Sequence, residues 1–325
     1  MTGANGLLGS FVVRKLVQEN IPFVALKRAG SDTSLLEDLS DRITWREADI
    51  CDPVALAEAL QDATTVIHVA ALVSFHPRDK KKLYNINVLG TRNVVNVCLT
   101  GTAKQFIHVS SVGALGKQKG QQQIDEGQKW VSNPLNSTYG ETKYLAELEV
   151  MRGQEEGLTT VIVNPSVILA PADWNRSSAM LFKYAYREHS FYTDGELNYV
   201  DVRDVADIIF QLLKSPFRGE RFIANSGTVS YKTLLDMMAA NFHKKPPSIR
   251  LGRRLVRVLA WLEDVRSRLT GASPLITKET ARATGLRVFF SNEKVKNRLN
   301  FHFRPVHETL EWCCKHYLQQ VNGEK

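Results

Sequence analysis

Residues 2–9 read Thr2-Gly3-Ala4-Asn5-Gly6-Leu7-Leu8-Gly9, with glycines three residues apart directly before an amphipathic stretch. Glycine has no Cβ, so the backbone can turn tightly and a pyrophosphate can approach the amides at the start of a helix. The helix dipole also favours an anion there. The pattern predicts a dinucleotide-binding loop between a first strand and a first helix, although a glycine triplet alone also fits a plain turn.

Only Met1 precedes this loop. In a doubly wound sheet the first strand is central, and a strand is typically about five or six residues long. The first strand is therefore missing from the sequence, and we expect that the reading frame begins upstream or that the start was trimmed. Upstream codons for a short run of Val, Ile or Leu would support this interpretation.

Composition narrows the class of protein. The chain has 325 residues, 43% of them hydrophobic, which suffices for a substantial core. No apolar run approaches the roughly twenty residues of a membrane span, so we expect a cytoplasmic protein without stable membrane insertion. The net charge of +8 comes from scattered basic residues without a zinc module or basic arm, so no nucleic-acid partner is expected. We expect no metal site, because metal-ligand spacing is absent from the four cysteines, Cys51, Cys98, Cys313 and Cys314.

Apolar runs alternate with helical patterns as far as about Ser166, which predicts an α/β fold with a Rossmann-like, doubly wound parallel sheet. We expect a dinucleotide-binding domain over residues 1–166 and a smaller α/β substrate lobe over 167–325, with segments crossing the boundary. The predicted strands are 21–27, 65–70, 105–109, 159–163, 199–202 and 221–224. The predicted helices are 54–60, 80–99, 139–151, 205–214, 231–242, 252–269 and 305–320. The apolar stripe of 252–269 suits packing over the lobe or contact with a membrane surface.

Tyr139 and Lys143 lie four residues apart on a predicted helix, so both side chains share one face. An adjacent ammonium lowers the pKa of a tyrosine from its usual value near 10, which makes the phenol a usable acid or base. Ser110 and Ser111 follow the strand 105–109, at the sheet edge where ligands bind. A surface pair and a helix cap are the alternative interpretations for these residues.

Together these residues resemble the extended short-chain dehydrogenase/reductase family, also called NAD-dependent epimerase/dehydratases. The resemblance places the catalytic serine at Ser111, with Ser110 as the alternative, and the YxxxK pair at Tyr139 and Lys143. Hydride transfer is then implied, with Tyr139 exchanging the substrate proton, Ser111 holding the substrate oxygen, and Lys143 lowering the tyrosine pKa and binding the nicotinamide ribose. The resemblance also implies a homodimer formed by the helices 80–99 and 139–151. The positions it implies for cofactor binding are Gly3, Asn5, Gly6, Leu7, Gly9, Lys27, Arg28, Asp49, Ile50, Val69, Ala70, Ala71, Asn87, Tyr139, Lys143 and Pro165. For Asn87, a polar contact within its own helix is an equal alternative.

The segment Ala25-Leu26-Lys27-Arg28 indicates the cofactor. An NAD site offers a carboxylate to the ribose hydroxyls after the second strand, whereas an NADP site offers a cation to the 2′-phosphate. Lys27 stands where the family has its acid, and Arg28 suits a phosphate. We expect a preference for NADP, with NAD as the alternative because Asp32 is close by.

The run 106–116 and Asn164-Pro165-Ser166 look most like the dihydroflavonol-4-reductase and 3β-hydroxysteroid dehydrogenase branches. Val112-Gly113 replaces the acidic pair of the dehydratases. Leu197-Asn198-Tyr199 lacks the arginine of sugar-nucleotide epimerases, although Arg176, Arg187 or Arg203 could serve instead. We expect an oxidoreductase for a lipophilic ketone, aldehyde or secondary alcohol. A nucleotide-sugar epimerase and a non-catalytic NADP-sensing module are the alternatives. The candidate substrate residues are Ser110, His76 and Trp174, chosen over Phe75, Tyr84, Trp130 and Tyr199.

Overall fold

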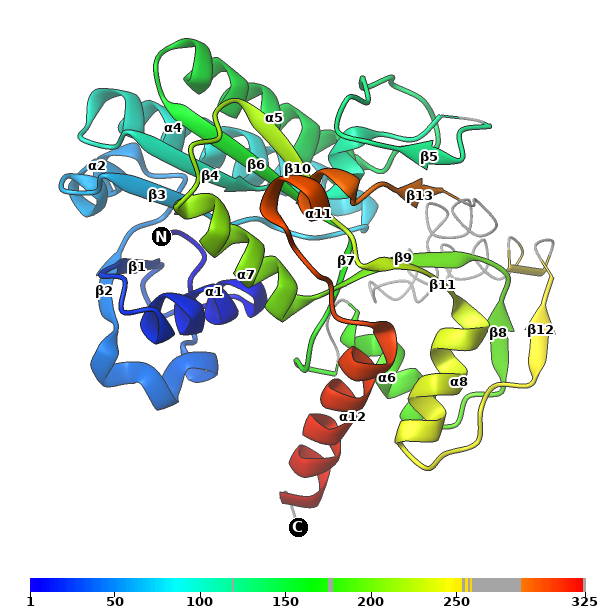
Figure 1. Ribbon diagram of the computed structural model, residues 1–325. Helices are drawn as coiled ribbons and strands as arrows, with labels where there is room; N and C mark the ends of the chain where they lie inside the picture. The colour runs from blue at the N-terminus through cyan, green and yellow to red at the C-terminus, as the bar shows by residue number, and fades with distance from the viewer. Residues whose placement is uncertain (119, 175–177, 253–254, 257, 259–287, 324–325) are drawn as a thin grey trace.

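A parallel sheet with the strand order β10-β6-β4-β3 forms the centre of the molecule (Figure 1). The computed structural model describes residues 1–118, 120–174, 178–252, 255–256, 258 and 288–323. The four strands are β3 (Thr65–His68), β4 (Gln105–Val109), β6 (Thr159–Pro165) and β10 (Glu220–Ala224). The chain is thus a Rossmann-like α/β fold, as its sequence predicts.

Met1 and Thr2 occupy the central position beside β3. Thr2 forms a parallel bridge with His68, and its amide donates to the Ile67 carbonyl at 3.0 Å. On the other side, the Leu26 amide donates to the Met1 carbonyl at 2.8 Å. These two residues therefore lie between β3 and β1, and they join β3 to the parallel pair β1 (Val24–Lys27) and β2 (Thr44–Glu47).

Helices cover both faces of the sheet, because alternate strand residues point to opposite sides. On one face α1 (Leu7–Gln18) and α7 (Val202–Leu213) pack on a cluster that includes Ile107 and Val161. On the other face α2 (Pro53–Leu60), α4 (Gly90–Thr100) and α5 (Thr138–Glu155) pack on a cluster that includes Phe106 and Ile162. Asp52 caps α2 by accepting from the Val54 amide at 3.0 Å, as Asp52-Pro53 leads one to expect.

The helix predicted over 80–99 is present and consists of three consecutive parts. They are α3 (Lys80–Leu83), a wide π-helical segment η3 (Tyr84–Leu89), and α4. Asn87 lies in the π segment, and its side-chain amide bonds both main-chain groups of Leu72, at 2.7 and 3.0 Å. The π segment thus faces the loop after β3, and π-bulges occur frequently at functional sites.

A separate sheet is formed by β11, β9 and β7, and two further strand pairs are β12 with β8 and β13 with β5. β10 and α7 come after residue 166 and still complete the first sheet and its cover, so segments cross the predicted boundary. The boundary itself stays a prediction, and most of the predicted helix 252–269 lies outside the described residues. The remaining described elements are η1 (Ser34–Arg42), η2 (Pro77–Asp79), η4 (Val112–Leu115), β5 (Gln123–Ile124), β7 (Val167–Leu169), α6 (Ala179–Tyr186), β8 (Phe191–Thr193), β9 (Glu196–Asp201), β11 (Gly227–Ser230), α8 (Tyr231–Asn241), β12 (Ile249–Leu251), β13 (Phe289–Phe290), α11 (Glu293–Leu299) and α12 (Val306–Gly323).

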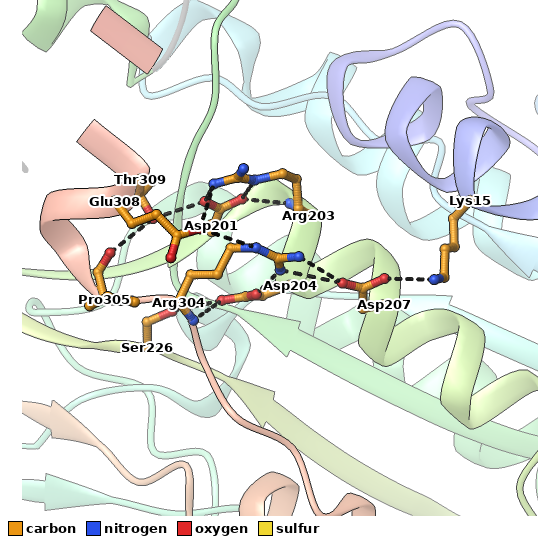
Figure 2. A network of polar contacts seen from close by, with 10 residues as sticks. All are labelled: Lys15, Asp201, Arg203, Asp204, Asp207, Ser226, Arg304, Pro305, Glu308 and Thr309. Carbon is orange, nitrogen blue, oxygen red and sulfur yellow. Dashed lines mark hydrogen bonds and ion pairs between the residues drawn. The ribbon is translucent and has the colours of Figure 1, made fainter. Parts of the chain in front are cut away.

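A network of ion pairs fastens the C-terminal segment to α7 (Figure 2). The Arg304 guanidinium pairs with Asp204 and lies 3.3 Å from Asp207, and the Arg304 amide donates to Asp204 at 3.0 Å. The buried Asp201 accepts from Thr309 at 2.8 Å. We call these five residues the tail clasp. Asp207 also pairs with Lys15 of α1 at 3.2 Å, so the clasp reaches both helices on this face.

Candidate active site

In the glycine turn of residues 2–9, main-chain segments approach one another so closely that side chains at the glycine positions would not fit. A Cβ on Gly9 would lie 2.0 Å from the Gly3 carbonyl oxygen, and one on Gly3 would lie 2.6 Å from the Ala70 nitrogen. Gly3 also has φ of +66°, which favours glycine. The Val69 amide donates to the Thr2 carbonyl at 3.3 Å. The structure therefore brings the glycine turn and the predicted segment 69–71 together.

The helix that follows offers amides to an anion. α1 begins at Leu7 with Gly6 at its N-cap, and no side chain caps it. Asn5 is fixed beside the turn, because its side chain donates to the Asp32 carbonyl at 2.9 Å. A tight glycine turn followed by an uncapped helix of 12 residues fits the pyrophosphate of a dinucleotide.

A hollow of about 560 Å³ lies at the end of β1 and β2. It is lined by Arg28, Ala29, Gly30, Ser31, Glu47, Ala48, Asp49 and Ala55. Arg28 is exposed at its rim, whereas the Lys27 ammonium lies 3.8 Å from the Glu47 carboxylate and over the Trp45 ring. Of the two predicted cations, Arg28 therefore borders the space, together with the predicted Asp49. The predicted Ile50 packs on Gly90 and is not among the residues that line the hollow.

Ser111 and Tyr139 meet where η4 packs on the start of α5. Ser111 caps η4 by accepting from the Gly113 amide at 3.1 Å, and Ser137 caps α5 by accepting from the Gly140 amide at 3.0 Å. The Ser111 hydroxyl lies close enough to the Tyr139 phenol to affect its pKa. The cap that was the alternative role for this serine is therefore real, and it fixes the hydroxyl beside the phenol.

Burial raises the pKa of Tyr139 to about 12, and the nearby Ser111 hydroxyl lowers it in part. This corrects the expectation that Lys143 brings the pKa down. The physical reason is that the Lys143 ammonium donates to the Val109 carbonyl at 2.9 Å, at the end of β4. Near neutral pH the phenol therefore holds its proton.

Lys143 is almost fully buried, with 1% of its surface exposed. Its ammonium also lies 3.4 Å from Nε2 of His108. Burial lowers the pKa of Lys143 to about 8, while the charge of Glu147, one turn along α5, raises it. The side chain thus remains a cation at neutral pH, close to the point where it loses its proton.

Polar residues that the sequence analysis passed over surround this lysine. The buried Glu147 accepts from the Asn164 side chain at 2.6 Å, and burial raises its pKa. Asn164 also donates to the Ser111 carbonyl at 3.0 Å, which ties the segment before Pro165 to the site. Ser110 lies on the side of Glu147 and affects its pKa, whereas Ser111 affects that of the phenol, so Ser111 is the better placed of the two serines. The sequence contained a signal for Glu147. It lies four residues after Lys143, and residues four apart share a helix face.

The Asn87 side chain is engaged by protein groups. Besides Leu72, it donates to the Thr142 hydroxyl on α5 at 3.1 Å. It therefore links the loop after β3 to the helix of Tyr139 and Lys143, and these contacts differ from the contact within its own helix that was the alternative.

The structure gives His76 a capping role and packs Trp174 among other aromatic side chains. His76 accepts from the Arg78 amide at 3.1 Å and caps η2. Trp174 packs in the second lobe, with its ring 4.4 Å from that of Tyr317. Phe75, which ranked below both in the sequence analysis, lies edge-on to Tyr139 with ring centroids 5.8 Å apart and is 44% exposed.

Of the arginines considered for a sugar diphosphate, Arg203 pairs with Asp201 at 2.6 Å and lies over the Trp312 ring. Arg176 lies outside the described residues, and the structure places Arg187 at the end of α6. Within the described part of the chain, no group of three or more His, Cys, Asp or Glu residues could hold a metal ion. No described helix is long and apolar enough to cross a membrane.

Comparison with known proteins agrees with this geometry. A model of the NAD dependent epimerase/dehydratase family matches residues 1–225. A provisionally named dihydroflavonol 4-reductase from Synechocystis sp. is 28% identical, over 95% of this chain and 91% of the relative. Sterol demethylase protein B from Methylococcus capsulatus is 27% identical, over 81% of this chain and 80% of the relative. The crystal structure of gox2253 is 30% identical with a TM-score of 0.84, over 98% of this chain and 97% of that one.

Proposed function

The chain belongs to the NAD-dependent epimerase/dehydratase family of extended short-chain dehydrogenases/reductases, and on that premise we propose that it transfers a hydride between NADP(H) and a lipophilic ketone, aldehyde or secondary alcohol. One observation carries the proposal. A protonated phenol, Tyr139, lies close to the Ser111 hydroxyl, one helical turn from a buried ammonium and in contact with an exposed phenylalanine ring.

Each part of the site has its own role in this reaction. The glycine turn and the start of α1 hold the pyrophosphate, and the segment 69–71 supports the turn. When bound, the nicotinamide supplies or accepts the hydride. Ser111 holds the substrate oxygen, and Tyr139 gives it a proton in the direction of reduction. Lys143 supplies positive charge near that oxygen, and its ammonium donates hydrogen bonds to the hydroxyls of the nicotinamide ribose.

Phe75 supports an apolar substrate. An exposed aromatic ring costs free energy in water, and its edge already contacts the phenol that would meet the reacting oxygen. Val73, two residues earlier, is 51% exposed. Two relatives support the same class of substrate. One is named for the reduction of a dihydroflavonol and the other for the demethylation of a sterol, and both molecules are flat and lipophilic.

Arg28 supports the preference for NADP. Its guanidinium borders the hollow, and Lys27 beside it adds positive charge that Glu47 only partly offsets. A planar guanidinium binds a phosphate through paired hydrogen bonds. Asp49 lines the same space and suits the adenine end of the cofactor.

We also propose a homodimer formed by α4 and α5 with the turns before α4. Apolar side chains are exposed on these elements, at Tyr84, Leu148 and Met151. Light scattering coupled to gel filtration tests this assembly. A single-chain mass at micromolar concentration contradicts it.

The decisive experiment replaces the phenol. Tyr139→Phe is expected to lower kcat at least about a hundredfold, because general acid catalysis contributes about 10²–10⁴-fold, while NADPH still binds. Tyr144→Phe is the matched control, since that tyrosine lies on the same helix and stacks on Trp130. A carbonyl panel with NADPH identifies the substrate. Unchanged turnover in Tyr139→Phe contradicts the mechanism, and tightly held NAD with activity on nucleotide sugars favours an epimerase instead.

A further inference from the structure

A fully buried histidine lies behind the site. His108 belongs to β4, and its ring stacks on that of His68 from β3, with centroids 5.3 Å apart. Its Nε2 lies 3.4 Å from the Lys143 ammonium. The imidazole is thus placed between the sheet and the helix that carries both Tyr139 and Lys143.

The contact fixes the tautomer of His108. An ammonium can only donate, so Nε2 must be unprotonated and Nδ1 must carry the proton. Nδ1 has no hydrogen-bond partner within the described residues. A buried donor without a partner is costly, and a phenylalanine such as the neighbouring Phe106 would avoid that cost. At position 108 the imidazole therefore leaves Nδ1 without a hydrogen bond, while Nε2 accepts one from Lys143.

We propose that His108 is a positioning residue for Lys143: its Nε2 and the Val109 carbonyl accept from the ammonium and fix it at the end of β4. This inference rests on the proposed function, in which Lys143 acts beside Tyr139. Both acceptors come from one strand, so a rigid element sets the position of the charge.

The contact also affects the protonation of Lys143. Two other titratable groups lie close by, Glu147 on α5 and His68 on β3. Burial lowers the pKa of His108 well below its usual value, so this ring remains neutral and does not repel the ammonium. A neutral acceptor favours the charged form of Lys143. Loss of the acceptor is therefore expected to lower the pKa of Lys143 further.

The test measures this pKa directly. Protein carrying ε-¹³C-lysine is titrated by NMR, with the Lys143 signal assigned through Lys143→Arg. In His108→Phe, which keeps a buried ring, we expect the midpoint to fall by roughly half to one pH unit, as the loss of one hydrogen bond predicts. In His108→Gln, whose side-chain oxygen can replace Nε2, the midpoint is expected to return to that of the unaltered protein. Lys117, whose pKa burial also lowers, is the internal control.

Kinetics provide the second measurement. The alkaline limb of kcat/KM is expected to move to lower pH in His108→Phe and to return in His108→Gln. If His108→Phe does not fold, His108→Asn replaces it, because its shorter amide does not reach the ammonium. An unshifted Lys143 midpoint in an active enzyme overturns the positioning role. A shifted midpoint in a protein that reduces no carbonyl compound overturns the proposed function and leaves the contact in place.

Discussion

The main chain of Gly140 lies directly against that of Gly113, so that a Cβ at position 140 would lie 2.7 Å from the Gly113 carbonyl oxygen. Gly113 belongs to the turn that Ser111 caps, and Gly140 follows Tyr139 on α5. The close approach of these two glycines therefore places the serine hydroxyl beside the phenol.

Gly140→Ala is expected to push η4 away from α5 and to separate Ser111 from Tyr139. We expect kcat to fall at least about tenfold, the effect of about 1.4 kcal/mol on a barrier, while NADPH affinity changes less than twofold. Gly153→Ala is the control, because its Cβ would meet side chains, those of Val95 and Leu158, and no main-chain atom of a neighbouring element. Steady-state kinetics and calorimetric binding measure both variants, and an unaltered kcat in Gly140→Ala contradicts the role of this contact.

Arg28→Ala is expected to weaken NADPH binding about tenfold or more, because hydrogen bonds to a charged group contribute about 1.5–3 kcal/mol. NADH has no 2′-phosphate, so its affinity is expected to change less than twofold. Lys27→Ala is expected to have the smaller effect on NADPH, since Lys27 already pairs with Glu47. Calorimetric titration with both cofactors decides the matter, and an equal loss for NADH and NADPH excludes Arg28 as the phosphate ligand.

Phe75→Ala is expected to raise KM for a large apolar ketone about tenfold or more, since burying a phenylalanine is worth about 1.5–3 kcal/mol. KM for a small, water-soluble ketone is expected to change little. Phe191→Ala, another exposed phenylalanine, on β8 of the second lobe, serves as the matched control. Equal effects on large and small substrates would show that Phe75 does not line the substrate site.

Lys143→Met is expected to abolish turnover and to stabilise the fold at neutral pH. The pKa of Lys143 is lowered from 10.5 to about 8 in the folded protein. The unfolded chain therefore binds the proton more tightly, and the buried charge costs free energy of folding below pH 8. That cost disappears as the pH rises from 8 to 10.5. We expect a gain of about 1–2 kcal/mol at pH 7, less than the full shift implies because two hydrogen bonds are lost, and almost none at pH 10.5. Urea denaturation at both pH values measures it, and a variant less stable than the parent at pH 7 contradicts this prediction.

Much of the fold is local in the sequence and could be predicted from it. The strand 105–109 and the helix that carries Tyr139 and Lys143 both depend on short-range patterns, and the structure contains both. The helix predicted over 80–99 is present, but the π segment within it was not predicted, because a short-range pattern does not reveal the bonds between Asn87 and Leu72 that accompany it.

The site depended more on tertiary contacts. Lys27 and Arg28 looked equivalent in sequence, and the parallel register that pairs Lys27 with Glu47 distinguishes them. The apolar run Gln105-Phe106-Ile107-His108-Val109 gave no indication that its histidine would meet Lys143. His76 and Trp174 were chosen for lying in loops, whereas only the path of the chain shows that Phe75 meets Tyr139.

The tail clasp also constrains the order of events during synthesis. Asp204 lies exactly 100 positions before Arg304, so its carboxylate leaves the ribosome well before its partner exists. At about 5–20 residues per second, that interval lasts about 5–20 seconds. During this interval α7, which covers one face of the sheet, carries the carboxylate of Asp204, and burial disfavours the charged form of that group. Until Arg304 emerges, the Asp204 carboxylate lacks its guanidinium partner, so this face of the nascent sheet is less stable than in the finished protein.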